Sequence, residues 1–139
     1  MIQKPDGALA FPFLSADSKN LLGLSFGELQ SAPQKFSTLI LQEDRQSWYE
    51  SLQTSAQRQL TLNWEGRIWI KDWHDVKWIN LRATPQNCGA QGVLWTGLMT
   101  NITEGKLQED DLRQSRAQLA ALAAHADQIR EEERASLAR

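Results

Sequence analysis

The sequence has little of what metal centres, disulfides and nucleophilic enzymes are built from. Its 139 residues include one cysteine, Cys88, and two histidines, His74 and His125. A single thiol cannot form an internal disulfide, so the composition fits a reducing compartment, and we expect a cytoplasmic location. Two histidines are too few for a histidine-rich metal site or a Ser-His-Asp triad, and no phosphate-binding loop is present. We therefore expect no metal site, no catalytic residue and no enzyme activity on this chain.

Long apolar runs and an excess of one charge sign are also missing. No stretch approaches the roughly 18 apolar residues that a membrane-spanning helix needs, so we expect no membrane insertion. The formal net charge is −2, and acidic and basic residues are interspersed. Such a chain has no basic stripe for nucleic acid, so we do not expect a nucleic-acid partner either.

Aromatic residues are absent from the end of the chain. Residues 1–103 contain all eleven aromatic side chains, including six tryptophans, whereas residues 104–139 contain fourteen charged side chains and no aromatic one. The first part is near the usual size of one domain, and the second has the composition of a long exposed helix. We predict a flexible N-terminus over residues 1–7, a globular domain over residues 8–103 and a helix over residues 104–139.

Hydrophobic spacing predicts an α+β fold for the globular part. Trp48, Leu52 and Ala56 lie four residues apart, which indicates one face of a helix. Apolar and polar residues alternate in later segments, which indicates strands. Because short connections join these strands, the sheet should be antiparallel, with short helices on one face. The expected elements are a strand over 8–14, small helices within 17–41, a helix over 43–57, strands over 60–71 and 76–83, a loop over 85–92 and a strand over 93–103.

The last segment carries a heptad pattern. Apolar side chains recur there in alternating steps of three and four residues, which is the spacing of a two-stranded coiled coil. A single helix cannot bury such a seam, so we predict a homodimer joined along it. The expected contacts of this coiled-coil seam are Leu112, Leu119, Leu122 and Ile129, with Ser115 and Ala126 as weaker members.

Short motifs in the globular part resemble, in the same order, those of PAS sensory domains. Leu21-Leu22-Gly23-Leu24-Ser25 and Leu41-Gln42-Glu43-Asp44-Arg45 are similar to the first half of that family. Glu65-Gly66-Arg67-Ile68, Trp95-Thr96-Gly97 and Asn101-Ile102-Thr103 are similar to its second half. The resemblance implies a PAS fold, which is an antiparallel sheet with short helices on one face, followed here by a long C-terminal coiled-coil helix.

The sequence departs from the PAS pattern at three positions. Trp73 replaces a glycine, so the turn that contains it should take a different shape, since bulky residues avoid positive φ. Gly66 replaces an aromatic residue, which weakens its strand or opens space beside it. Asn101 replaces an aspartate and keeps the capacity for hydrogen bonds without the charge.

The end of the chain is similar to a narrower group. Residues 128–139 resemble the helix that leads into the dimerisation and phosphoacceptor region of nitrate-sensor-like histidine kinases. This resemblance implies a PAS sensor module of a two-component histidine kinase, whose kinase region and response regulator are not on this chain. Two alternatives stay open: a ligandless PAS dimerisation spacer, and a PAS input to another output such as a diguanylate cyclase.

The PAS resemblance also implies where a ligand would bind. Trp48 lies on the helix that faces the PAS cavity, where its indole either lines a pocket or fills it. Residues 43–57 contain no histidine to bind haem, and Cys88 lies in a loop, so we expect neither haem nor a photoactive flavin and predict no cofactor. The candidate pocket residues are Phe36, Trp48, Leu52, Ile68, Ile79 and Leu81.

Two further groups complete the predicted sites. Asn101, Ile102 and Thr103 join the last strand to the helix, so they are the expected route of signal transmission. Trp69 and Trp78 fall on the sheet face opposite the core, where exposed apolar side chains usually mark an interface. We predict that both indoles pack against a partner subunit or the N-terminal segment.

Overall fold

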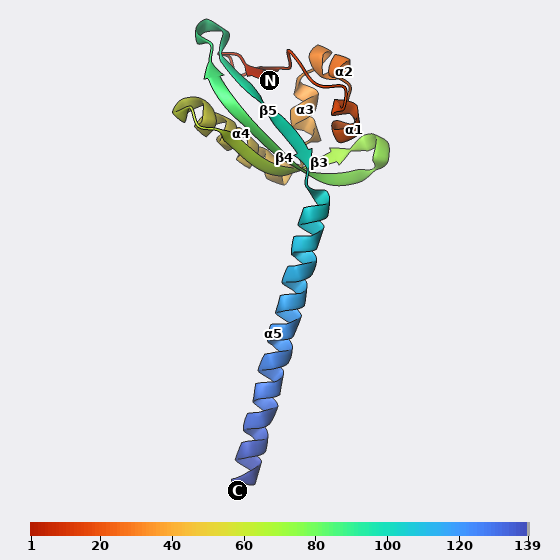
Figure 1. Cartoon of the computed structure of the whole chain (residues 1–139), viewed down its shortest axis with the longest axis vertical. Helices are drawn as coiled ribbons and strands as arrows, with labels where there is room; N and C mark the ends of the chain where they lie inside the picture. The colour runs from red at the N-terminus through yellow and green to blue at the C-terminus, as the bar shows by residue number, and fades with distance from the viewer. Residues whose placement is uncertain (139) are drawn as a thin grey trace. The chain divides into compact units, whose positions relative to one another are not determined.

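The computed structural model of the chain describes residues 1–138, so the predicted helix residue Arg139 lies outside the described residues. Met1–Thr103 form one compact unit, and the chain from Glu104 onward belongs to a second. The first unit is built on five strands and four helices (Figure 1). The strands are β1 (Ile2–Gln3), β2 (Leu9–Ala10), β3 (Leu62–Ile70), β4 (Asp75–Asn87) and β5 (Val93–Asn101). The helices are α1 (Ser18–Leu22), α2 (Phe26–Ser31), α3 (Gln34–Leu39) and α4 (Gln42–Arg58).

The five strands form one antiparallel sheet in the order β2-β1-β5-β4-β3. Along β3, buried and exposed residues alternate, which is the period of a strand with one face on the core. The short helices lie against that face (Figure 1). The predicted α+β fold, with an antiparallel sheet and short helices on one face, is therefore confirmed.

A row of aromatic side chains fills the space between the sheet and the helices. The ring centroids of Phe11 and Phe36 are 5.6 Å apart, those of Phe36 and Trp48 5.4 Å, and those of Trp48 and Trp64 4.9 Å. The first two pairs meet edge to face, an arrangement that the ring quadrupoles favour. The row joins the segment after β2 to α3, α4 and β3.

Gly66 of β3 lies beneath the last ring of this row. A Cβ added at Gly66 would come within 2.1 Å of Cζ2 of Trp64. Of the two expected effects of this glycine, a weaker strand or open space beside it, the second does not occur, because the indole of Trp64 occupies that space.

The prediction of a flexible segment over residues 1–7 is wrong for its first residues. Ile2 and Gln3 form β1, which pairs with both β2 and β5. The strand expected over residues 8–14 is limited to Leu9–Ala10 because the chain leaves the sheet before Pro12, whose nitrogen carries no hydrogen.

The loop predicted over residues 85–92 is also too long. β4 continues to Asn87, and Pro85 pairs with Trp95 within the β4–β5 ladder. The nitrogen of Pro85 faces the β3 side of β4, where the β3 partners end with Leu62 opposite Ala83. The proline therefore removes no hydrogen bond from the sheet, which is why a strand tolerates it here.

The turn between β3 and β4 places its positive φ at a residue other than Trp73. Lys71–Trp73 form a 3-10 turn, η1, and the positive φ of 45° falls on His74. The His74 N–H donates to the carbonyl of Lys71 at 3.2 Å. Trp73 thus keeps an ordinary backbone conformation.

The second unit is formed by α5 (Thr103–Leu137), a helix of 35 residues. The prediction of a long C-terminal helix is confirmed. No helix within residues 1–138 has the length and apolar character needed to cross a membrane. The same residues bring together no group of three or more His, Cys, Asp and Glu side chains that could hold a metal ion.

Candidate functional site

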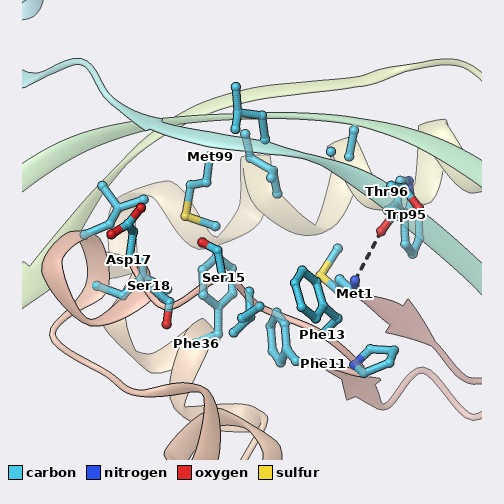
Figure 2. A pocket seen from close by; sticks show the side chains of 18 of the residues that line it. Met1, Phe11, Phe13, Ser15, Asp17, Ser18, Phe36, Trp95, Thr96 and Met99 are labelled. Atoms are coloured by element: carbon cyan, nitrogen blue, oxygen red, sulfur yellow. Dashed lines mark hydrogen bonds between the residues drawn. The ribbon is translucent and has the colours of Figure 1, made fainter.

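A cavity of about 770 Å³ lies between β5 and the segment that follows β2 (Figure 2). Met99 faces it from the sheet, and Phe11 and Phe13 face it from the opposite segment. Polar groups come from Ser15 and Asp17, among others. An apolar cavity with a few polar side chains is the usual form of a small-molecule site.

The cavity lies beside the part of β5 that β1 does not cover. Strand β1 pairs with β5 only at Val93 and Leu94, and one further pair of backbone bonds links Met1 to Trp95. The Met1 ammonium donates to the Trp95 carbonyl at 3.1 Å, shown dashed in Figure 2, and burial lowers the pKa of this ammonium. Beyond Trp95, no strand of residues 1–138 covers this edge of β5.

The candidate pocket residues divide between this cavity and the packed core. Phe36 and Leu81 line the cavity. Trp48, Leu52, Ile68 and Ile79 do not; all four are at most 2% exposed and belong to the core. Because the Trp48 ring packs between Phe36 and Trp64, its indole fills the space where we had also considered a pocket.

Hydrogen bonds tie the end of β5 to the neighbouring strand. The Ile102 N–H donates to the Trp78 carbonyl at 2.9 Å, and the Trp78 N–H donates to Thr103 Oγ1 at 2.9 Å. Asn101 Oδ1 accepts from the Thr103 N–H at 3.0 Å and from Thr103 Oγ1 at 2.6 Å. The three residues predicted to transmit a signal thus form one connected turn at the start of α5, and Asn101 needs no charge for this role.

Comparisons with known proteins agree with this arrangement. No family model and no curated protein sequence matches the chain. A solved structure of a sensory box histidine kinase/response regulator from Burkholderia thailandensis has a TM-score of 0.62 and 25% identity, over 78% of this chain and 80% of that one. The chain contains a PAS sensory domain. The antiparallel sheet, the short helices on one face and the long helix that follows β5 are those the PAS resemblance implied.

Two other solved structures share the PAS fold at lower identity. A domain of a protein described as a light and redox sensing histidine kinase from Haloarcula marismortui has a TM-score of 0.58 and 21% identity, over 70% of this chain and 83% of that one. The N-terminal domain of a diguanylate cyclase with a PAS/PAC sensor from Marinobacter aquaeolei has a TM-score of 0.59 and 17% identity, over 70% and 88%.

Two serines of α4 attach this helix to the PAS sheet, and the sequence patterns did not reveal them. Trp95 Nε1 donates to Ser55 Oγ at 2.9 Å, and this hydroxyl donates to the Leu60 carbonyl at 2.7 Å. Trp64 Nε1 donates to Ser47 Oγ at 3.1 Å. Their helical position is the only signal in the sequence that places them near the core: Ser47 directly precedes Trp48, and Ser55 lies three residues, about one turn, after Leu52.

An ion pair fixes the start of α4 on the edge strand β3. Asp44 Oδ2 accepts from the Arg67 backbone N–H at 2.8 Å and from Nε at 2.9 Å, while Oδ1 accepts from a terminal guanidinium nitrogen at 2.8 Å. These hydrogen bonds hold the pKa of the Asp44 carboxyl below its ordinary value of 3.8, against an opposing effect of burial. Both residues lie in PAS motifs, but the motifs did not predict their contact.

Trp69 and Trp78 lie on the PAS sheet face away from the core, as their alternation predicted. Trp69 is 40% exposed and Trp78 is partly buried. The Arg67 guanidinium lies 5.6 Å from the centroid of the Trp78 ring. That these indoles contact a partner subunit stays a prediction.

The predicted coiled-coil seam is exposed in a single copy of the chain. Leu112, Leu119, Leu122 and Ile129 of α5 are between 43% and 66% exposed. Such a row of branched side chains at heptad spacing is suited to burial against a second helix.

Proposed function

We propose that this PAS domain is the input module of a two-component histidine kinase. The observation that carries the proposal is the hydrogen-bonded turn of Asn101, Ile102 and Thr103, from which α5 starts with its exposed heptad seam. The sheet has two conformations in this proposal, and a ligand that binds one of them more tightly raises the population of that conformation. The turn passes the change to α5. The resemblance of residues 128–139 to nitrate-sensor-like kinases supports this output.

The module acts as a homodimer in this proposal, with α5 paired along the coiled-coil seam. The kinase region and a response regulator of the parent protein are its downstream partners, and the module works in the cytoplasm. Two of the similar solved structures belong to proteins described as histidine kinases. We propose that the signal is a small apolar molecule bound in the β5 cavity, without haem or a photoactive flavin. Residues 42–58 contain no histidine, and Cys88 is not among the cavity residues.

A second output is supported by one comparison. The Marinobacter aquaeolei structure comes from a diguanylate cyclase, and PAS domains with the same fold can therefore precede a cyclase. A ligandless spacer is favoured by the packed Trp48 but not by the cavity beside β5.

The proposal is tested by fusing residues 1–139 in register to the core of a histidine kinase and measuring autophosphorylation. The reference is the same kinase core carrying only residues 104–139. We expect the complete fusion to differ from this reference in rate, and Asn101→Ala with Thr103→Ala to bring the rate to that of the reference. Thr84→Ala with Thr100→Ala is the matched control, because both threonines are exposed on the sheet. Wild-type regulation in a folded junction variant would falsify the proposed coupling.

A further inference from the structure

The uncovered edge of β5 presents unpaired backbone groups next to the apolar cavity. Trp95 directs its N–H and carbonyl toward Met1, so residues two and four further along direct theirs to the same side. These residues are Gly97 and Met99, and both line the cavity. Because the backbone groups of Trp95 face Met1, the hydrogen bonds from β5 to β4 come from its even-numbered residues, and within residues 1–138 Gly97 and Met99 each keep a free donor and a free acceptor.

We propose that this edge binds an extended apolar peptide segment of a partner protein as an added strand. Addition of a strand to a free sheet edge is a general mode of peptide recognition, in which backbone bonds supply affinity and alternate side chains fill pockets. The edge from Gly97 to Asn101 spans about 14 Å, enough for about five residues of the incoming strand. This inference is independent of the kinase output proposed above, but the inward side chains of the peptide would compete with a small apolar ligand for the same cavity.

Strand β1 already shows how such a segment is held. Met1 exchanges both backbone hydrogen bonds with Trp95, and its side chain lines the cavity. A strand placed in line with β1 repeats this geometry opposite Gly97 and Met99. Its inward side chains enter the cavity, and the side chains between them lie beside Leu98, which is 68% exposed on the other face. Apolar inward residues are required because Phe13, Phe36 and Leu81 are among the cavity walls.

A peptide strand fits the site better than a second copy of β5 does. Two β5 edges paired about a two-fold axis would bring one cavity against the other, because the free stretch of each edge directs Gly97, Met99 and Asn101 toward its own cavity. Neither cavity would receive a side chain large enough to fill it. A separate strand with branched inward residues fills the cavity and also forms hydrogen bonds with the free backbone groups of the β5 edge.

The probe for the test is a capped hexapeptide of alternating valine and threonine, added to the chain of residues 1–139. In the proposed register, the valines face the cavity and their N–H groups face β5. We expect saturable binding by calorimetry and slower hydrogen exchange at the amides of Gly97 and Met99. The control peptide carries N-methyl groups on its valines, and we expect it to bind about tenfold or more weakly, since it has lost several backbone donors.

A pair of protein variants tests the edge from the other side. Met99→Pro removes a donor that makes no bond to β4, so the strand should persist while peptide affinity falls about tenfold. Met99→Leu keeps the N–H and should bind as the wild type does, and the melting temperature of each variant reports on folding. The inference is wrong if no binding occurs at millimolar peptide, or if either N-methylation or Met99→Pro leaves affinity unchanged. Protection of Gly97 and Met99 that rises with protein concentration alone would also overturn it, in favour of a second copy.

Discussion

Three tryptophans direct indole rings into the core, and they differ in what their N–H groups reach. Trp64 and Trp95 donate to serine hydroxyls of α4. Trp48 Nε1 is buried and has no hydrogen-bond partner within residues 1–138. A buried donor without an acceptor costs about 1–3 kcal/mol, so Trp48 keeps its place through ring packing alone.

Replacement by phenylalanine distinguishes an indole N–H that has a hydrogen-bond acceptor from one that has none. Trp48→Phe and Trp95→Phe remove the same atoms, but Trp95→Phe also leaves Ser55 Oγ without its donor. We expect Trp95→Phe to lower the free energy of unfolding by about 1–2 kcal/mol more than Trp48→Phe does. Denaturant unfolding of both variants measures the difference, with Trp64→Phe as a second hydrogen-bonded case. If all three variants lost the same unfolding free energy, the indole N–H of Trp48 would have to have a hydrogen-bond acceptor.

The Asp44–Arg67 pair makes stability depend on pH in a defined direction. Because the folded pKa of Asp44 lies below its ordinary value of 3.8, the ionised form stabilises the fold above that pH. The contribution is lost as the pH falls through the lower folded pKa. We expect Asp44→Asn to lose about 1–2 kcal/mol at pH 7 and progressively less below pH 4, in urea titrations. Glu43→Gln, in the same helical turn, should show no comparable loss.

At the scale of elements, periodicity predicted the long segments and failed on the short ones. The helix expected over 43–57 is α4, Gln42–Arg58, and the alternating segments are β3, β4 and β5. β1 has two residues, too few to show a period, and pairing with β5 creates it. Glycine and asparagine after Pro85 suggested a loop over 85–92, but β4 continues to Asn87 because the nitrogen of Pro85 faces the side of β4 without a partner, which only tertiary pairing decides.

The turn between β5 and α5 depends on one hydroxyl. Thr103→Val keeps the shape of the side chain but removes the acceptor of the Trp78 N–H and the donor to Asn101. We expect a loss of about 1–2 kcal/mol in unfolding free energy and faster hydrogen exchange at the Trp78 amide. Thr103→Ser should keep the unfolding free energy and the slow exchange of the Trp78 amide, and Thr100→Val should change neither quantity. If the valine variant protects the Trp78 amide as well as the wild type does, the hydroxyl has no role in the turn.

At the scale of the whole molecule, the division at residue 104 could be predicted and the cavity could not. The loss of aromatic residues after residue 103 marked the boundary between the two compact units. Of the six candidate pocket residues, Phe36 and Leu81 reach the cavity. The other four are core because Trp48 fills the middle of the domain, and a sequence pattern does not tell a ring that lines a space from one that occupies it.

The proposed dimer depends on the seam of α5. Leu119→Gln with Leu122→Gln places two amides in the seam and should shift sedimentation from dimer to monomer. Ala120→Gln with Ala124→Gln adds the same side chains on the opposite side of the heptad and should leave the dimer intact. A dimer that survives the leucine replacements would have to be formed by another surface, such as that of Trp69 and Trp78.

The indole of Trp64 over Gly66 makes these two positions interdependent. Any side chain at position 66 would collide with the Trp64 ring, whose nearest atom lies 2.1 Å from the place of a Cβ. Homologues that keep the aromatic residue usual at position 66 should therefore carry a smaller residue at position 64, and the pair should covary. An aromatic residue at position 66 alone would clash with Trp64, and a smaller residue at position 64 alone would leave a void. Evolution or design can therefore place the aromatic residue at position 66 only by changing both positions.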